Sequence, residues 1–189
     1  MKQEIRNINE PLSVDNESRH VVGYAAVWER ESNDLGFIET IKRGAITQEL
    51  CDNCDVFCRF DHDPNRILAR SRYGKGSMTL TVDERGLKYE FDAPKTALGD
   101  ELLEYIKRGD IYQSSFCFSM SGKEGTEKWE KRDGKYYRTI LKIDKLWDTA
   151  PCWLPAYSDT SVDNRSFTEI TENEANLNSK LQEILSLAI

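Results

Sequence analysis

The sequence predicts a mainly β fold with a few surrounding helices (α+β). Two observations lead to this prediction. Short segments rich in β-branched and aromatic residues recur through the first two thirds of the chain, and only a few segments show helical periodicity. Short strands at this frequency are typical of an antiparallel sheet, or of a closed or partly closed barrel decorated with helices. The 189 residues suffice for one ordinary domain with a single core.

Seven segments have the composition of strands: 19–28, 36–41, 56–60, 77–82, 87–91, 136–143 and the residues around Trp147. Segment 77–82 alternates strictly between apolar and polar residues, and 87–91 alternates again after a turn at 83–86. These two segments therefore predict a hairpin. The charge-rich segment 123–135 is predicted to be a solvated loop.

Three segments have helical signals. Thr96 can cap a helix over 97–108, which has its apolar residues on one face and Gly109 at its end. A shorter helix is expected over 46–51. The tail over 173–189 places leucines and an isoleucine at helical spacing. We therefore expect a catalytic domain at 1–166 and a C-terminal helical appendage at 167–189.

Composition and charge limit the class of protein. The formal net charge of −7 and the pI near 5.0 argue against a nucleic-acid partner and against an anionic membrane surface. There is no apolar run of about 20 residues, as a membrane-spanning helix needs, and the first residues lack the apolar region of a secretory signal. A cytoplasmic protein with reduced thiols is the expectation, since the five cysteines are an odd number. Neither a phosphate-binding nor a dinucleotide-binding glycine motif is present, so we expect no cofactor.

His62 and Ser115 are the first candidates for a catalytic pair. His62 is one of only two histidines, and Ser115 lies in the strand-like segment 115–118. A general base and a nucleophile can come from distant parts of a sequence, and Asp148 offers a carboxylate to orient the histidine. Each also has a structural interpretation: an ordinary core or surface histidine, a serine no better than its neighbour Ser114, and a carboxylate satisfied by backbone or arginine.

A zinc site is the competing constellation. Cys51, Cys54 and Cys58 are followed four residues later by His62, and thiolates with an imidazole can bind zinc. The predicted ligands run from a helix into a strand without a second tight turn. Three buried cysteines that act as small apolar groups are the simpler interpretation.

The chain resembles the prohead (procapsid maturation) proteases of tailed bacteriophages, which are relatives of the herpesvirus assemblin serine proteases. Short segments carry the resemblance in order: GYAAVW (23–28), ETIKRGAI (39–46), DHDP (61–64), DERGL (83–87), GDI (109–111), SFCF (115–118) and PAYSDT (155–160). Each segment alone is weak, but together and in register they are specific, and they cover about 21–162.

The resemblance implies an assemblin-type barrel and assigns the site residue by residue. It makes His62 the catalytic histidine, Ser115 the nucleophile and Asp148 the third member of the triad. The family usually has a glutamate where this chain has the shorter Asp148. We expect activity to rise from acid to neutral pH in one histidine-like step.

The resemblance also implies partners and a location. Such proteases act inside the procapsid in the host bacterial cytoplasm, where they cut scaffold protein or the scaffold-like N-terminal region of the major capsid protein, and often themselves. A homodimer is a further candidate assembly. The tail is expected to be a self-cleaved packaging segment, a dimer helix or a cap on the barrel. The alternative function is a catalytically inactive capsid-assembly or scaffolding module with the same barrel.

Overall fold

The structure is a computed structural model that describes residues 3–8, 10–14, 18–153 and 171–180. The chain divides into two compact units, Met1–Ser158 and Asp159–Ile189. Residues 171–180 of the second unit form a helix, in agreement with the first part of the helix predicted over 173–189. The predicted boundary at 166, the rest of that helix and the segment 155–160 lie outside the described residues.

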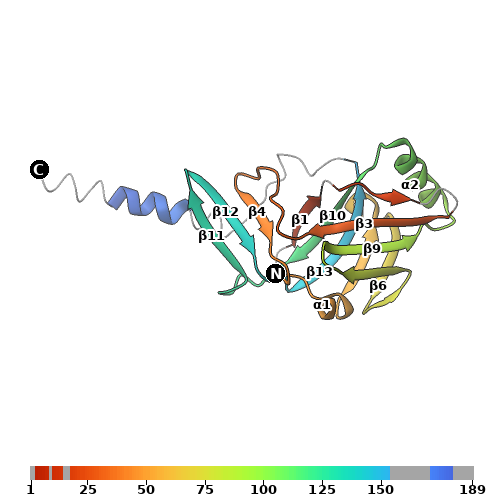
Figure 1. Cartoon of the computed structure of the whole chain (residues 1–189), viewed down its shortest axis with the longest axis horizontal. Helices are drawn as coiled ribbons and strands as arrows, with labels where there is room; N and C mark the ends of the chain where they lie inside the picture. Colours follow the sequence, from red (N-terminus) through yellow and green to blue (C-terminus); the bar gives the residue numbers. More distant parts are fainter. Residues whose placement is uncertain (1–2, 9, 15–17, 154–170, 181–189) are drawn as a thin grey trace, which may run out of the picture. The chain divides into compact units, whose positions relative to one another are not determined.

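The strands of the first unit form three sheets (Figure 1). The six-stranded sheet has the order β1 (Gln3–Ile8), β10 (Gln113–Ser119), β13 (Lys145–Cys152), β5 (Asp55–Arg59), β6 (Ile67–Arg72) and β7 (Lys75–Gly76). The four-stranded sheet has the order β2 (Ser13–Val14), β3 (His20–Val27), β9 (Gly86–Asp92) and β8 (Met78–Val82). The three-stranded sheet has the order β11 (Glu127–Arg132), β12 (Lys135–Ile140) and β4 (Ile38–Ile41). The described residues of this unit also form three helical segments: α1 (Gln48–Asp52), the 3₁₀ turn η1 (Phe60–His62) and α2 (Ala97–Arg108).

The predicted hairpin and the predicted long helix are both confirmed. β8 and β9 pair antiparallel, and the Asp83 carboxylate accepts hydrogen bonds from the main-chain N–H groups of Arg85 and Gly86 in the turn. α2 begins after Thr96, whose hydroxyl accepts from the third residue beyond it, and ends at Gly109 in the left-handed conformation (φ 78°).

The mainly β prediction is confirmed, but the antiparallel barrel is not. The pairings of β13 with β5 and of β12 with β4 are parallel, so two of the three sheets are mixed. Among the residues that the structure describes, the sheets do not close on themselves. The prediction of a solvated loop over 123–135 was wrong, because β11 occupies the middle of it and forms a hairpin with β12. The short helix lies at Gln48–Asp52, slightly later than predicted.

The core lies between the six-stranded and four-stranded sheets. β3 packs against β10 and β13, and every residue of β10 is buried. The tyrosine hydroxyl of Tyr89 on β9 lies 2.9 Å from the hydroxyl of Ser114 on β10, so a hydrogen bond joins the two sheets through the apolar interior. Burial raises the pKa of Tyr89 well above its usual value. In the large sheet, β10 and β13 each have a hydrogen-bonded neighbour on both sides.

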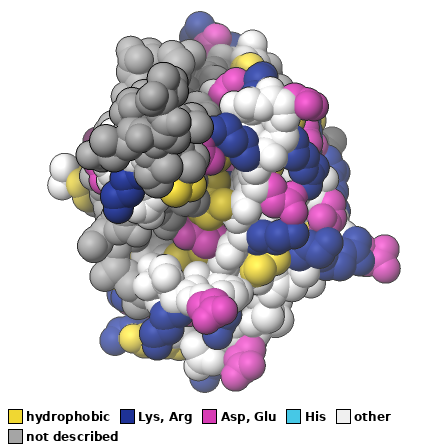
Figure 2. Space-filling view, turned by 90° about the vertical axis from the view of Figure 1, so that its left-hand side faces the viewer, with side chains coloured by type: hydrophobic (Ala, Val, Ile, Leu, Met, Phe, Trp, Pro, Cys, Tyr) yellow, Lys and Arg dark blue, Asp and Glu magenta, His cyan; other side chains and the backbone are white. Residues whose placement is uncertain are grey.

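Charged side chains of both signs cover the surface of the unit. On the face shown in Figure 2, Lys and Arg side chains lie beside Asp and Glu side chains. β11 gives one example, since Glu130 pairs with both Lys128 and Arg132. The many charged residues in the sequence of β11 therefore fit a surface of mixed charge.

Candidate active site

The side chains of His62, Ser115 and Asp148 lie in hydrogen-bond contact. The His62 Nδ1 atom is 2.7 Å from Asp148 Oδ1, and its Nε2 atom is 2.6 Å from Ser115 Oγ. The three residues come from η1, β10 and β13, which are 86 residues apart at the extremes. Distances in this range are those of strong hydrogen bonds.

The sheet places Ser115 and Asp148 on one face. In the antiparallel pairing of β10 with β13, Ser115 lies opposite Ala150 and Cys117 lies opposite Asp148. Side chains two residues apart in a strand project to the same side, and directly paired residues share that side. The carboxylate and the hydroxyl therefore stand on neighbouring strands, close enough for one imidazole to bridge them.

A left-handed turn presents His62 to both partners. Asp61 has φ 53° and His62 has φ 59°, a conformation that residues other than glycine adopt at a cost. The preceding Phe60 anchors the turn, because its fully buried ring packs edge-on against Trp153 at 5.7 Å and beneath the Arg66 guanidinium at 3.9 Å. The turn thus places the imidazole in contact with Ser115 on β10 and Asp148 on β13.

Comparisons with known proteins decide the family. The family model described as caudovirus prohead serine protease matches residues 5–174, which is most of the chain. The chain belongs to this family. It is a serine protease by that membership, and the resemblance seen in the sequence is confirmed.

Other comparisons bear on the fold of this family member. The structure of the bacteriophage T4 capsid assembly protease, gp21, is similar at a TM-score of 0.50 with 13% identity, over 82% of this chain and 98% of that chain. At this identity the likeness concerns the fold. The search of curated proteins finds no match. In the described part of the chain, no helix is both long enough and apolar enough to span a membrane.

The neighbouring serine has a different environment. Ser114 projects to the opposite face of β10, where Tyr89 holds its hydroxyl in the core. Ser115 alone of the two contacts His62. The sequence left open which serine faces the histidine. Because side chains alternate along a strand, the two serines face opposite sides of β10, and Ser115 is the one on the side of His62.

Arg59 is a site residue that sequence reasoning missed. Its Nη1 atom donates to Asp148 Oδ2 at 2.9 Å, so each oxygen of the carboxylate has its own partner. Asp148 is only 3% exposed, and a buried carboxylate needs such partners. The alternation of β5 places Arg59 and Phe57 on one face, and the guanidinium lies over the Phe57 ring. That alternation was visible in the sequence, whereas the partner of Arg59 was not.

The main chain of Arg6 is a second contact that no sequence signal indicated. The Ser115 hydroxyl donates to the Arg6 carbonyl at 2.9 Å, and Ser115 is fully buried. β1 pairs antiparallel with β10, with Asn7 opposite Ser115 and Arg6 opposite Phe116. A segment more than 100 residues away in the sequence therefore forms one wall of the site.

The cysteines do not form the zinc site that was the alternative. The imidazole nitrogens of His62 contact Ser115 and Asp148, and no group of three or more His, Cys, Asp or Glu side chains within the described ranges could hold a metal ion. All five thiols are buried and unpaired by disulfides. Burial raises the pKa of Cys117, the thiol nearest Asp148 in register, to about 12, so it stays protonated at neutral pH.

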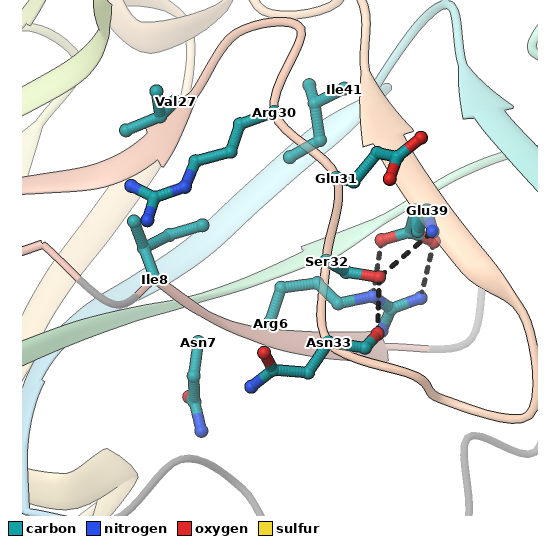
Figure 3. Close-up of a pocket in the computed structure, with 10 residues that line it drawn as sticks. All are labelled: Arg6, Asn7, Ile8, Val27, Arg30, Glu31, Ser32, Asn33, Glu39 and Ile41. Carbon is teal, nitrogen blue, oxygen red and sulfur yellow. Dashed lines mark hydrogen bonds and ion pairs between the residues drawn. The ribbon is translucent and has the colours of Figure 1, made fainter.

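A pocket adjoins β1 near the site (Figure 3). Residues of β1, β3, β4 and the segment between β3 and β4 line it: Arg6, Asn7, Ile8, Val27, Arg30, Glu31, Ser32, Asn33, Glu39 and Ile41. Neither His62 nor Ser115 is among them, although Asn7 lies opposite Ser115 in the sheet. The pocket is thus lined in part by the strand that pairs with the strand of Ser115.

Proposed function

We propose that the chain is a serine endopeptidase of the Ser-His-Asp type that matures phage procapsids. The observation that carries this proposal is the position of His62, within 2.6 Å of a serine hydroxyl and 2.7 Å of a buried carboxylate. Family membership supports the reaction class, and the geometry supports the residue roles. Asp148 takes the place of the glutamate usual in the family and still reaches the imidazole.

The proposed mechanism follows from the proton positions. His62 with its proton on Nδ1 donates to Asp148 and leaves Nε2 free to accept the Ser115 proton. The serine oxygen then attacks the peptide carbonyl, and Nε2–H afterwards protonates the departing amine. Asp148 holds the tautomer and stabilises the imidazolium that forms. Arg59 fixes the other carboxylate oxygen and thereby the direction of the one that faces His62.

The proposed substrates are capsid proteins inside the procapsid in the host cytoplasm. The similar bacteriophage T4 protein is a capsid assembly protease. We infer that this chain cleaves scaffold protein, or the scaffold-like N-terminal region of the major capsid protein. Cleavage of its own tail between 163 and 172, and a homodimer as the active form, belong to the same proposal.

Co-expression with the cognate capsid and scaffold proteins tests the proposal. We expect the wild type to shorten at least one of them, as read by intact mass, and Ser115→Ala to leave both at full length. Ser114→Ala is the matched control, because it removes a hydroxyl from the same strand without touching His62. Full-length partners with the wild type, together with normal capsid assembly, would instead favour the inactive assembly module.

A further inference from the structure

The Ser115 hydroxyl lies between two acceptors but has only one hydrogen. Its oxygen is 2.6 Å from His62 Nε2 and 2.9 Å from the Arg6 carbonyl oxygen. If the hydroxyl donates to a neutral imidazole, the carbonyl faces an oxygen with no hydrogen between them. If it donates to the carbonyl, the lone pair of Nε2 faces the serine oxygen instead. With neutral His62 that carries its proton on Nδ1 and donates it to Asp148, one of the two contacts is always unsatisfied. A neutral His62 with its proton on Nε2 satisfies both contacts but loses the hydrogen bond to Asp148.

Both contacts are satisfied when His62 is charged. Nε2–H then donates to Ser115 Oγ, and the serine hydroxyl donates onward to the Arg6 carbonyl. The burial of Ser115 leaves no exposed surface at which water could replace either partner. The relay Nε2–H···Oγ–H···O=C therefore favours the imidazolium, which cannot act as a base.

Buried ion pairs fix the position of this carbonyl. The Arg6 guanidinium is 6% exposed and binds both oxygens of Glu39 on β4, with Nε at 2.5 Å and Nη2 at 2.9 Å (Figure 3). Nη2 also donates to Glu4 at 2.7 Å, and Arg138 on β12 binds the same two glutamates. A slip of β1 by one residue would turn Arg6 to the opposite face and break all of these contacts.

Several charged groups surround the His62 imidazole. Asp148 accepts from Nδ1, and Arg59 on β5 partly neutralises that carboxylate. Asp61 and Asp63 flank His62 in the turn. Burial raises the pKa of Asp61, while the nearby charges of His62 and Arg66 oppose this rise. None of these groups acts on His62 through Ser115. The effect of the Arg6 carbonyl on the protonation of His62 can therefore be separated from theirs.

We propose that Arg6 is a positioning residue whose main-chain carbonyl, acting through Ser115, stabilises the charged form of His62. The Arg6–Glu39 ion pair holds this carbonyl in register. The inference rests on the proposed function, since it treats His62 as the base for Ser115. This interaction would keep Ser115 inactive as a nucleophile at mildly acidic pH, and Ser115 would become active when His62 loses its proton.

The two histidines allow a direct test by NMR. The imidazole resonances of His62 and His20 can be followed with pH in the full chain, with His20 as the internal control because it contacts Asp92 on another sheet. Cys51 offers a ligation site for a synthetic segment 1–50. In that segment Asn7 is replaced by its α-hydroxy acid, so that an ester carbonyl at Arg6 becomes a weaker acceptor. Replacing Ile5 by its α-hydroxy acid weakens the main-chain carbonyl of Glu4 instead, and this protein is the matched control.

We expect the ester at Arg6 to lower the midpoint of the His62 titration by about 0.5 pH unit, because one hydrogen bond of the charged relay is weakened. The control ester and the His20 midpoint should show no change. In a Ser115→Ala background the ester at Arg6 should have no effect, because the relay is already interrupted. A His62 midpoint that is unchanged or raised, or a fall that persists without the Ser115 hydroxyl, would overturn the inference.

A variant of the side chain tests the positioning. Arg6→Lys keeps the charge but cannot bind both Glu39 oxygens, and we expect it to lower the His62 midpoint in the same direction. Thermal unfolding reports separately on any loss of stability. Because the titration is read without substrate, it can fail while capsid proteins are still cleaved, and it can succeed while they are not. Failure of this inference is thus distinct from failure of the proposed function.

Discussion

Asp148→Asn tests the proposed role of the carboxylate most sharply. Asp148 has two acceptor oxygens, one engaged by His62 and the other by Arg59. An asparagine in the same position has one acceptor oxygen and one NH₂ group. The charged guanidinium attracts the oxygen more strongly, so the NH₂ group turns toward His62 Nδ1. His62 then carries its proton on Nε2 and cannot accept the proton of Ser115.

The expected loss follows from this change of tautomer. Since Asp148 is 3% exposed, water cannot restore the missing acceptor. A wrong tautomer in a triad of this kind costs on the order of 10³- to 10⁴-fold in rate, which corresponds to about 4–5.5 kcal/mol of transition-state stabilisation. The fold should persist, because the substitution keeps size and one hydrogen bond.

The rate at which a fluorophosphonate labels the protein, read by intact mass, measures this loss. Asp61→Asn is the matched control, since it also removes a carboxylate beside His62, makes no hydrogen bond to the imidazole in the described structure, and tolerates the left-handed conformation. We expect the control to label within tenfold of the wild type. Labelling of Asp148→Asn within tenfold of the wild type would refute the assigned role.

Three further predictions concern stability and thiol chemistry. The five cysteines are buried, so the native protein should resist alkylation at pH 7.5 and all five should react after unfolding in urea; rapid native labelling would contradict this. Although burial opposes it, the hydrogen bonds and charges of Arg138 and Arg6 leave the pKa of Glu4 below its usual value. The resulting stability is present above the ordinary pKa of a glutamate and lost as pH falls through the lowered one, so the Tm should drop between pH 5 and pH 3, and less steeply in Glu4→Gln. Gly99→Ala should lower the Tm despite the better helix propensity of alanine, because a Cβ would lie 2.0 Å from the Pro94 carbonyl oxygen; an unchanged Tm would show that this contact relaxes freely.

The elements that could be predicted from the sequence are those whose signals lie within a few residues of one another. The β8–β9 hairpin and α2 have strict alternation, a capping threonine and a terminal glycine, and each of these acts within a few residues. β11 was missed because Glu and Lys dominate it, although Asp133 and Gly134, both with positive φ, form the kind of turn that joins hairpin strands. The order of strands in the sheets depends on contacts across the whole chain, which periodicity does not encode.

In the candidate site, too, some residues could be predicted from the sequence and others depend on contacts across the whole chain. His62, Ser115 and Asp148 could be named from residue type together with family resemblance, because their chemistry is specific. Arg59 and the carbonyl of Arg6 could not. An arginine in a strand has many candidate partners, and a main-chain carbonyl has no sequence signature. These two contacts become visible only when β1, β5, β10 and β13 lie side by side.

The most direct test of the central claim is to find which residue a fluorophosphonate modifies. Purified wild type, Ser115→Ala and Ser114→Ala are treated in parallel, weighed as intact proteins and mapped as peptides. An activated Ser115 predicts a single adduct on that residue in the wild type and in Ser114→Ala, and none in Ser115→Ala. An adduct that persists in Ser115→Ala, or no adduct in the folded wild type, would contradict the claim.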